Sequence, residues 1–146
     1  MTGVQTWLFR SAPQVTIPDG MVVDADLPTA APGSPCAQGD VTVVAWSDLN
    51  RRAKDATTPI PADGVTIAVG NGGHHHTLYG AGFFDARNDE MVYGTLTVPT
   101  DGMVVLLHTD PSRRLSDEHG AVQVTAGTYR IGGQREQADE IRRVAD

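Results

Sequence analysis

The 146-residue chain has little cysteine, few aromatic side chains and no long hydrophobic run. Its only cysteine, Cys36, cannot form an intrachain disulfide, so the fold cannot depend on one. Aromatic residues make up 5% of the chain and hydrophobic residues 40%, which predicts a core built mainly from valine and other aliphatic side chains. No stretch approaches the ~20 apolar residues of a membrane span. The N-terminus also lacks a basic segment followed by a long apolar one, so we expect no signal peptide and a cytoplasmic protein at synthesis.

Basic side chains are scarce as well. Eleven Lys and Arg residues stand against eighteen Asp and Glu residues, which gives a formal net charge of −7. A nucleic-acid-binding face needs a basic surface that neutralises phosphates, and an anionic membrane makes the same demand. We therefore expect a protein partner or further copies of the same chain, and neither nucleic acid nor membrane.

A turn followed by a strand recurs along the chain. Residues 15–26, 59–70 and 96–110 each combine an apolar residue, a proline, an Asp-Gly pair and a β-branched run. Proline sets φ for the first turn position and Asp-Gly tolerates the left-handed half of the turn, while β-branched residues favour a pleated surface. The pattern predicts strands over 21–23, 65–69 and 103–108.

Similar apolar runs predict further strands, and helix signals are few. A helix of two turns is expected over 47–56, where Ser47 is a good N-cap, and 134–146 can form either a helix or an extended tail. Gly94 marks a possible bulge. We predict an all-β, single-domain sandwich or barrel of about 7–9 short strands with little helix. The additional strands are expected over 41–46, 76–79, 91–98, 121–124 and 128–131.

The first 37 residues differ from the rest of the chain. Residues 29–39 are rich in Pro, Gly and Ser and read as an extended or mobile linker. Ahead of them, Trp7, Leu8 and Phe9 form an apolar cluster that must pack somewhere, either on its own domain or on a neighbouring subunit. This division predicts an N-terminal arm over 1–37 and a β domain over 38–146.

Histidines are the most conspicuous candidate site residues. In an extended segment His74 and His76 point to one face, and an H-x-H pair on a strand is a good start for a transition-metal site such as Zn or Fe. His108 ends a predicted strand and His119 follows an acidic loop, so these two could supply further ligands. The alternative is that adjacent histidines in a glycine-rich turn simply face water.

Acidic residues near the last two histidines could complete such a site. A neutral imidazole ligand needs an acceptor for its other nitrogen, and Asp110, Asp117 and Glu118 are nearby candidates. A 2-His-1-carboxylate site could use His108, Asp110 and His119, although the second histidine is unusually close in sequence. No G-x-S-x-G elbow and no P-loop is present, and no residue is assigned a catalytic role.

A cupin-like site would require an acid soon after the H-x-H pair. The sequence departs from that pattern, because no acid follows His76 before Asp85. Cupin-like chemistry is therefore a weaker expectation than metal binding alone.

Several motifs resemble a family of small uncharacterised proteins of bacteria and their phages. The resemblance covers residues 38–146 and departs at Asn71 and Gly72, where the family usually has Glu and Thr, and at Gln137, where an aromatic is common. It implies that both histidine segments belong to one module, and it implies no reaction. The matching positions are Gln38-Gly39-Asp40-Val41, the His74–His76 segment, His108, Glu118-His119, Gly127-Thr128-Tyr129, Gln134-Arg135-Glu136 and Arg143-Val144-Ala145-Asp146.

These observations favour a non-catalytic assembly protein. We expect a bacteriophage head-associated protein, either capsid-decorating or a minor capsid component, which docks on neighbouring subunits through its arm and its strand edges and so ends in the virion. The alternatives are a metal-binding β-barrel or cupin-like metalloenzyme that uses His74, His76, His108 and His119, and a ligand-binding β-barrel with the histidines lining a pocket.

Overall fold

The computed structural model describes residues 28–69, 73–87, 92–109 and 120–133, and the backbone of a short hairpin, β1 (Val15–Thr16) with β2 (Val22–Val23). Trp7, Leu8, Phe9, His119 and the 134–146 segment lie outside the described residues. Apart from one turn of 3-10 helix, every regular element in these ranges is a strand. The predicted all-β fold is therefore confirmed.

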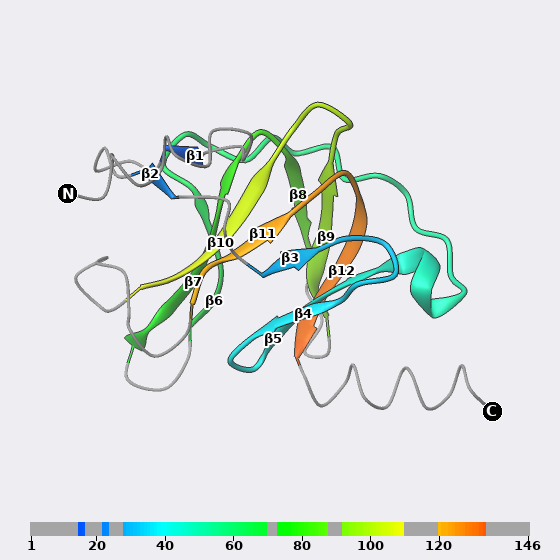
Figure 1. The fold of residues 1–146 in the computed structure, drawn as a ribbon, viewed down its shortest axis with the longest axis horizontal. Helices are drawn as coiled ribbons and strands as arrows, with labels where there is room; N and C mark the ends of the chain where they lie inside the picture. The colour runs from blue at the N-terminus through cyan, green and yellow to red at the C-terminus, as the bar shows by residue number, and fades with distance from the viewer. Residues whose placement is uncertain are drawn as a thin grey trace.

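Two five-stranded sheets form the body (Figure 1). The first has the strand order β3-β11-β10-β7-β6 and the second the order β4-β5-β12-β9-β8, and neither closes into a barrel. All pairs are antiparallel except β3 with β11. The elements are β3 (Thr29–Ala30), β4 (Cys36–Gln38), β5 (Val41–Ala45), η1 (Trp46–Leu49), β6 (Val65–Val69), β7 (His75–Gly80), β8 (Phe83–Ala86), β9 (Val92–Val98), β10 (Val104–Thr109), β11 (Val122–Val124) and β12 (Gly127–Gly133).

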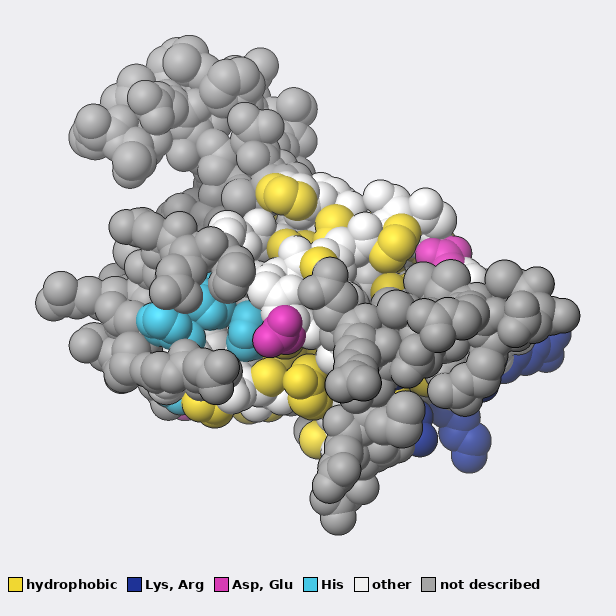
Figure 2. Space-filling model, turned by 90° about the horizontal axis from the view of Figure 1, so that it is seen from below, with side chains coloured by type: hydrophobic (Ala, Val, Ile, Leu, Met, Phe, Trp, Pro, Cys, Tyr) yellow, Lys and Arg dark blue, Asp and Glu magenta, His cyan; other side chains and the backbone are white. Residues whose placement is uncertain are grey.

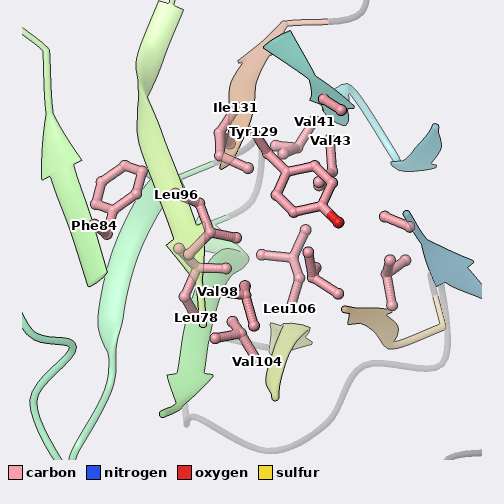
Figure 3. Packing of buried hydrophobic residues seen from close by; sticks show 14 residues of the cluster. Val41, Val43, Leu78, Phe84, Leu96, Val98, Val104, Leu106, Tyr129 and Ile131 are labelled. Atoms are coloured by element: carbon pink, nitrogen blue, oxygen red, sulfur yellow. The ribbon is translucent and has the colours of Figure 1, made fainter. Parts of the chain in front are cut away.

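The core lies between the two sheets, and it is mainly aliphatic as the composition predicts (Figure 3). Leu78 and Leu106 from the first sheet pack in one cluster with Val43, Leu96 and Ile131 from the second. Alternation along the strands explains which of their residues enter the core, because successive side chains point to opposite faces of a sheet. The arrangement is that of a β-sandwich.

The first sheet is buried on its outer face as well. Val105 and Leu107 of β10 point away from the core cluster, yet they are almost completely buried, together with Tyr79 of β7. All six residues of β10 are buried for this reason. The β1–β2 hairpin, which belongs to the first 37 residues, contacts β7.

Residues 29–38, which composition marks as a linker, contribute one edge strand to each sheet. β3 pairs in parallel with β11, and β4 pairs with β5 through a tight turn at Gly39, whose φ is 57°. The chain between them turns at Gly33, whose backbone N–H donates to both carboxylate oxygens of Asp48. Together with β8, these strands raise the number in the two sheets to ten, above the predicted count.

The predicted helix over 47–56 is wrong. Only η1 forms, and it ends at Asn50, which adopts the left-handed conformation with φ 53° and ψ 36°. Threonine side chains then replace helical hydrogen bonds beyond this point: Thr97 Oγ1 accepts from the N–H of Ala56 at 2.8 Å, and Thr128 Oγ1 donates to Asp55 Oδ1 at 2.7 Å. The segment therefore runs along the outer face of the second sheet.

The bulge predicted at Gly94 is found next to it. Ile131 of β12 pairs with Gly94 of β9 while Gly132 pairs with Val92, so Tyr93 is the additional residue. A side chain at Gly94 would meet Phe84 and the Asp85 carbonyl at 2.4–2.5 Å, which explains why glycine stands there.

Candidate functional site

The two histidine segments lie side by side in the first sheet. β7 and β10 pair antiparallel in a register that sets His76 opposite His108 and His75 opposite Thr109. His76 and His108 are 5% and 4% exposed, so neither faces water. The alternative that the adjacent histidines of the glycine-rich turn face water is therefore wrong for His76.

Histidine side chains gather at one end of the molecule, as Figure 2 shows in cyan. The centroid of the His108 ring lies 4.7 Å from that of His76 and 4.9 Å from that of His74, with interplanar angles of 57° and 52°. His74 directly precedes β7 and is half-buried. His74 and His76 thus share one side of the strand, as the alternation of an extended segment predicts. We call His74, His76 and His108 the histidine cluster.

A buried amide from the other sheet fixes the orientation of the cluster. Gln38, on β4, is 2% exposed, and its Nε2 donates to the carbonyl oxygens of Leu106 at 2.8 Å and Gly120 at 2.9 Å. Its Oε1 lies 2.9 Å from His76 Nδ1. Because an amide oxygen only accepts, the Nδ1 of His76 carries the proton.

The Gln38 side chain therefore joins the two sheets through hydrogen bonds, and those to Leu106 and His76 are buried. We call it the amide clamp. Gln38 was recognised in the sequence as part of a turn and of a family motif, but not as a site residue. No local signal identifies it, because its hydrogen-bond partners lie 38 to 82 positions later in the chain.

The metal site predicted from His74, His76, His108 and His119 is brought together in part. The first three histidines meet, and His119 lies outside the described residues, as do Asp110, Asp117 and Glu118. Within the ranges that the structure describes, no three His, Cys, Asp or Glu side chains are arranged to hold a metal ion. The acceptor for the His76 Nδ1 is the Gln38 amide, which was not among the predicted acidic partners.

Cys36, the single thiol, lies on β4 two residues before the amide clamp. It is half-buried, and burial raises the pKa of the thiol, which keeps it protonated at neutral pH. Nothing in its surroundings supports nucleophilic chemistry.

A sandwich of two five-stranded, mainly antiparallel sheets with a histidine cluster at one end defines the class of this domain. The model of a domain of unknown function, DUF8820, matches residues 37–134, about two thirds of the chain. The chain belongs to this uncharacterised family, and the match begins one residue before the amide clamp. No curated protein and no solved structure matches the chain. Among the described residues, no helix is long and apolar enough to cross a membrane.

Proposed function

We propose that this protein is a non-catalytic assembly protein that docks on neighbouring copies of itself through the β6 edge and the N-terminal arm. The observation that carries the proposal is the edge of the first sheet. β6 is five residues long, and within the described residues it pairs only with β7. A strand edge with unpaired backbone groups is a template for strand addition from a second chain.

The composition of β6 fits such a docking edge. Thr66 and Val69 point to solvent, and Val69, 62% exposed, is the exposed large hydrophobic residue of the described ranges. No lysine, proline or inward charge protects the strand, although such residues commonly prevent pairing at edges. The register shift between Thr66 and Ala68 is the one irregularity along its pairing with β7.

The burial of the histidines supports a structural role rather than catalysis. Gln38 and His76 use their polar groups inside the sandwich, where their hydrogen bonds join the two sheets, and the His108 ring is buried beside them. The assembly that we propose is a bacteriophage head, with this chain as a capsid-decorating or minor capsid component. The family resemblance to phage proteins and the β body with an arm motivate that choice.

The assembly proposal is tested by mass measurement on the full chain. Light scattering over a concentration series should give an oligomer for the wild type, and a lower mass for Val69→Lys and for a variant that lacks residues 1–12. Thr100→Lys is the matched control, since Thr100 is exposed in a turn outside β6. A wild type that stays monomeric and does not bind particles would contradict the proposal, as would unchanged mass in both variants.

Metal binding is the second candidate, and one observation favours it. The Nδ1–H of His76 donates to the Gln38 amide oxygen, and a metal-ligating histidine commonly donates its second ring nitrogen to such an acceptor. Elemental analysis of tag-free protein decides the question. About one equivalent of Zn or Fe that disappears in His108→Ala would support a metal site, and less than about a tenth of an equivalent would exclude a strong one.

A further inference from the structure

We infer that a cleft on the outer face of the second sheet is a binding site for a small phosphorylated molecule. The cleft lies between the segment that follows η1 and strands β8 and β9, and its volume is about 580 Å³. Small-molecule sites usually measure about 300–1,000 Å³. Four basic residues line it: Arg51, Arg52, Lys54 and Arg87. We call it the basic cleft.

The distribution of positive charge makes the basic cleft unusual. The described ranges contain five Lys and Arg residues, of which four line the cleft and are exposed. The fifth, Arg130, is 1% exposed and lies inside the body. In a chain of net charge −7, every exposed cation of the described part therefore borders one cavity. The dark blue side chains visible in Figure 2 lie at the end of the molecule opposite to the cyan histidines.

The path of the backbone brings these cations together. The left-handed Asn50 ends η1, and the N–H of Arg51 donates to the carbonyl of Trp46 at 3.2 Å, which turns the chain sharply. Residues 51–55 then form one wall of the cleft, and Arg87, directly after β8, extends the other. Arg87 comes from a segment more than thirty residues away in sequence, so no linear motif creates the group.

The two acidic residues of the cleft already accept hydrogen bonds from the protein. Asp55 Oδ1 accepts from Thr128 Oγ1 at 2.7 Å. Asp85 accepts from the backbone N–H of Thr57 at 3.1 Å and of Thr58 at 3.0 Å. These bonds give both acids a structural role, and among the described lining residues four cations stand against two acids. A cleft lined by one sign of charge concentrates ligands of the other sign.

The lining chemistry selects the class of ligand. Guanidinium groups bind phosphate oxygens in pairs, and several cations in one cavity favour a ligand with more than one negative charge. A nucleic acid would need an extended basic surface, whereas the chain is acidic overall and the exposed cations of its described part border one cavity. The cleft therefore fits a small molecule that carries phosphate groups. This inference does not depend on the proposed assembly function, because neither β6 nor the arm lines the cleft.

Calorimetric titration with inorganic pyrophosphate at 150 mM salt tests the inference. We expect the full-length wild type to bind with a Kd below about 1 mM, and the double variant Arg52→Ala/Lys54→Ala to bind about tenfold more weakly or not at all. Both substituted side chains are exposed, so the variant should unfold at the wild-type temperature. The control Ala62→Glu/Thr100→Glu changes the net charge by the same two units at exposed positions outside the lining, and it should bind like the wild type.

Three results would overturn the inference. One is no pyrophosphate binding by the wild type, and another is equal weakening in the control, which would mean a general charge effect. The third is tighter binding of citrate or of a single-stranded oligonucleotide than of pyrophosphate, which would replace the phosphorylated small molecule by a carboxylate or a nucleic acid.

Discussion

The histidine cluster and the basic cleft lie at opposite ends of the molecule and handle polar groups in opposite ways. In the histidine cluster, His76 and His108 are buried, and Gln38 reaches across from the other sheet and accepts a hydrogen bond from His76. In the basic cleft, the cations are exposed, and Asp85 accepts hydrogen bonds from the backbone of the wall. Conspicuous histidines from two segments are thus packed against one another, whereas less conspicuous basic residues border the open cavity.

The largest loss of stability is expected when the amide clamp is removed. Gln38→Met keeps the length of the side chain but leaves the His76 Nδ1–H and two carbonyls without their partner. A buried polar group that loses its hydrogen bond costs about 1–3 kcal/mol, so we expect the free energy of unfolding in urea to fall by about 2–4 kcal/mol.

Gln123→Met is the matched control for the clamp. Gln123 is also buried and lies on β11, but its Oε1 accepts no hydrogen bond from the described residues. Its replacement should lower the free energy of unfolding by less than about 1 kcal/mol. If both variants lose the same amount, the clamp has no special role.

A second test separates the members of the histidine cluster. His108→Ala removes a buried ring that contacts two others, and the resulting cavity should cost about 2–4 kcal/mol of unfolding free energy. His74→Ala removes a half-buried ring at the start of β7 and should cost less than about 1 kcal/mol. Both free energies of unfolding are measured by urea denaturation. An equal loss in the two variants would mean that burial does not determine how much each ring stabilises the fold.

A smaller effect is expected for the hydrogen bond that closes the turn before β12. The Tyr129 hydroxyl donates to the carbonyl of Thr125 at 2.7 Å, and Tyr129→Phe should lower the free energy of unfolding by about 1 kcal/mol. Burial raises the pKa of Tyr129, so its contribution is complete below the unfolded pKa of about 10 and is lost as pH rises through the higher folded value. The Phe variant should therefore lose less stability between pH 8 and pH 11 than the wild type; an identical loss would contradict this.

Strands with a clear local pattern were predictable from the sequence. Residues 65–69 form β6 at the predicted positions, and β10 is displaced by one residue from its prediction. β3, β4 and β8 were not predicted, since they are short edge strands and the first two lie in a Pro/Gly-rich segment. Their partners are far away in sequence: β3 pairs with β11 over ninety residues later, a contact that local propensity does not encode.

The candidate sites were likewise predictable only where a local sequence pattern determined them. The H-x-H spacing predicted correctly that His74 and His76 share a face, and the strand register brought His108 to them. The amide clamp could not be derived, because the sequence contains no signal that pairs Gln38 with a histidine thirty-eight positions later. The basic cleft was missed because the expected helix over 47–56 would have spread Arg51, Arg52 and Lys54 around its surface, whereas Asn50 ends the helix and the threonines hold the segment flat.

The smallest effect is expected in the wall of the basic cleft, where the loss of one carboxylate should change only local amide exchange and not the histidine cluster. Hydrogen bonds from Thr58 and Thr57 hold the pKa of Asp85 below its usual range, so the contribution of this carboxylate is present above the unfolded pKa of about 4 and is lost as pH falls through the lower folded value. Asp85→Asn should speed amide hydrogen exchange of Thr57 and Thr58 at pH 6 and leave His76 and its neighbours unaffected. Asp101→Asn, at an exposed turn, is the control and should change neither. Unchanged exchange at Thr57 and Thr58 would show that the carboxylate does not hold the wall, whereas slowed folding of the whole domain would show that the cleft and the core are not separate units.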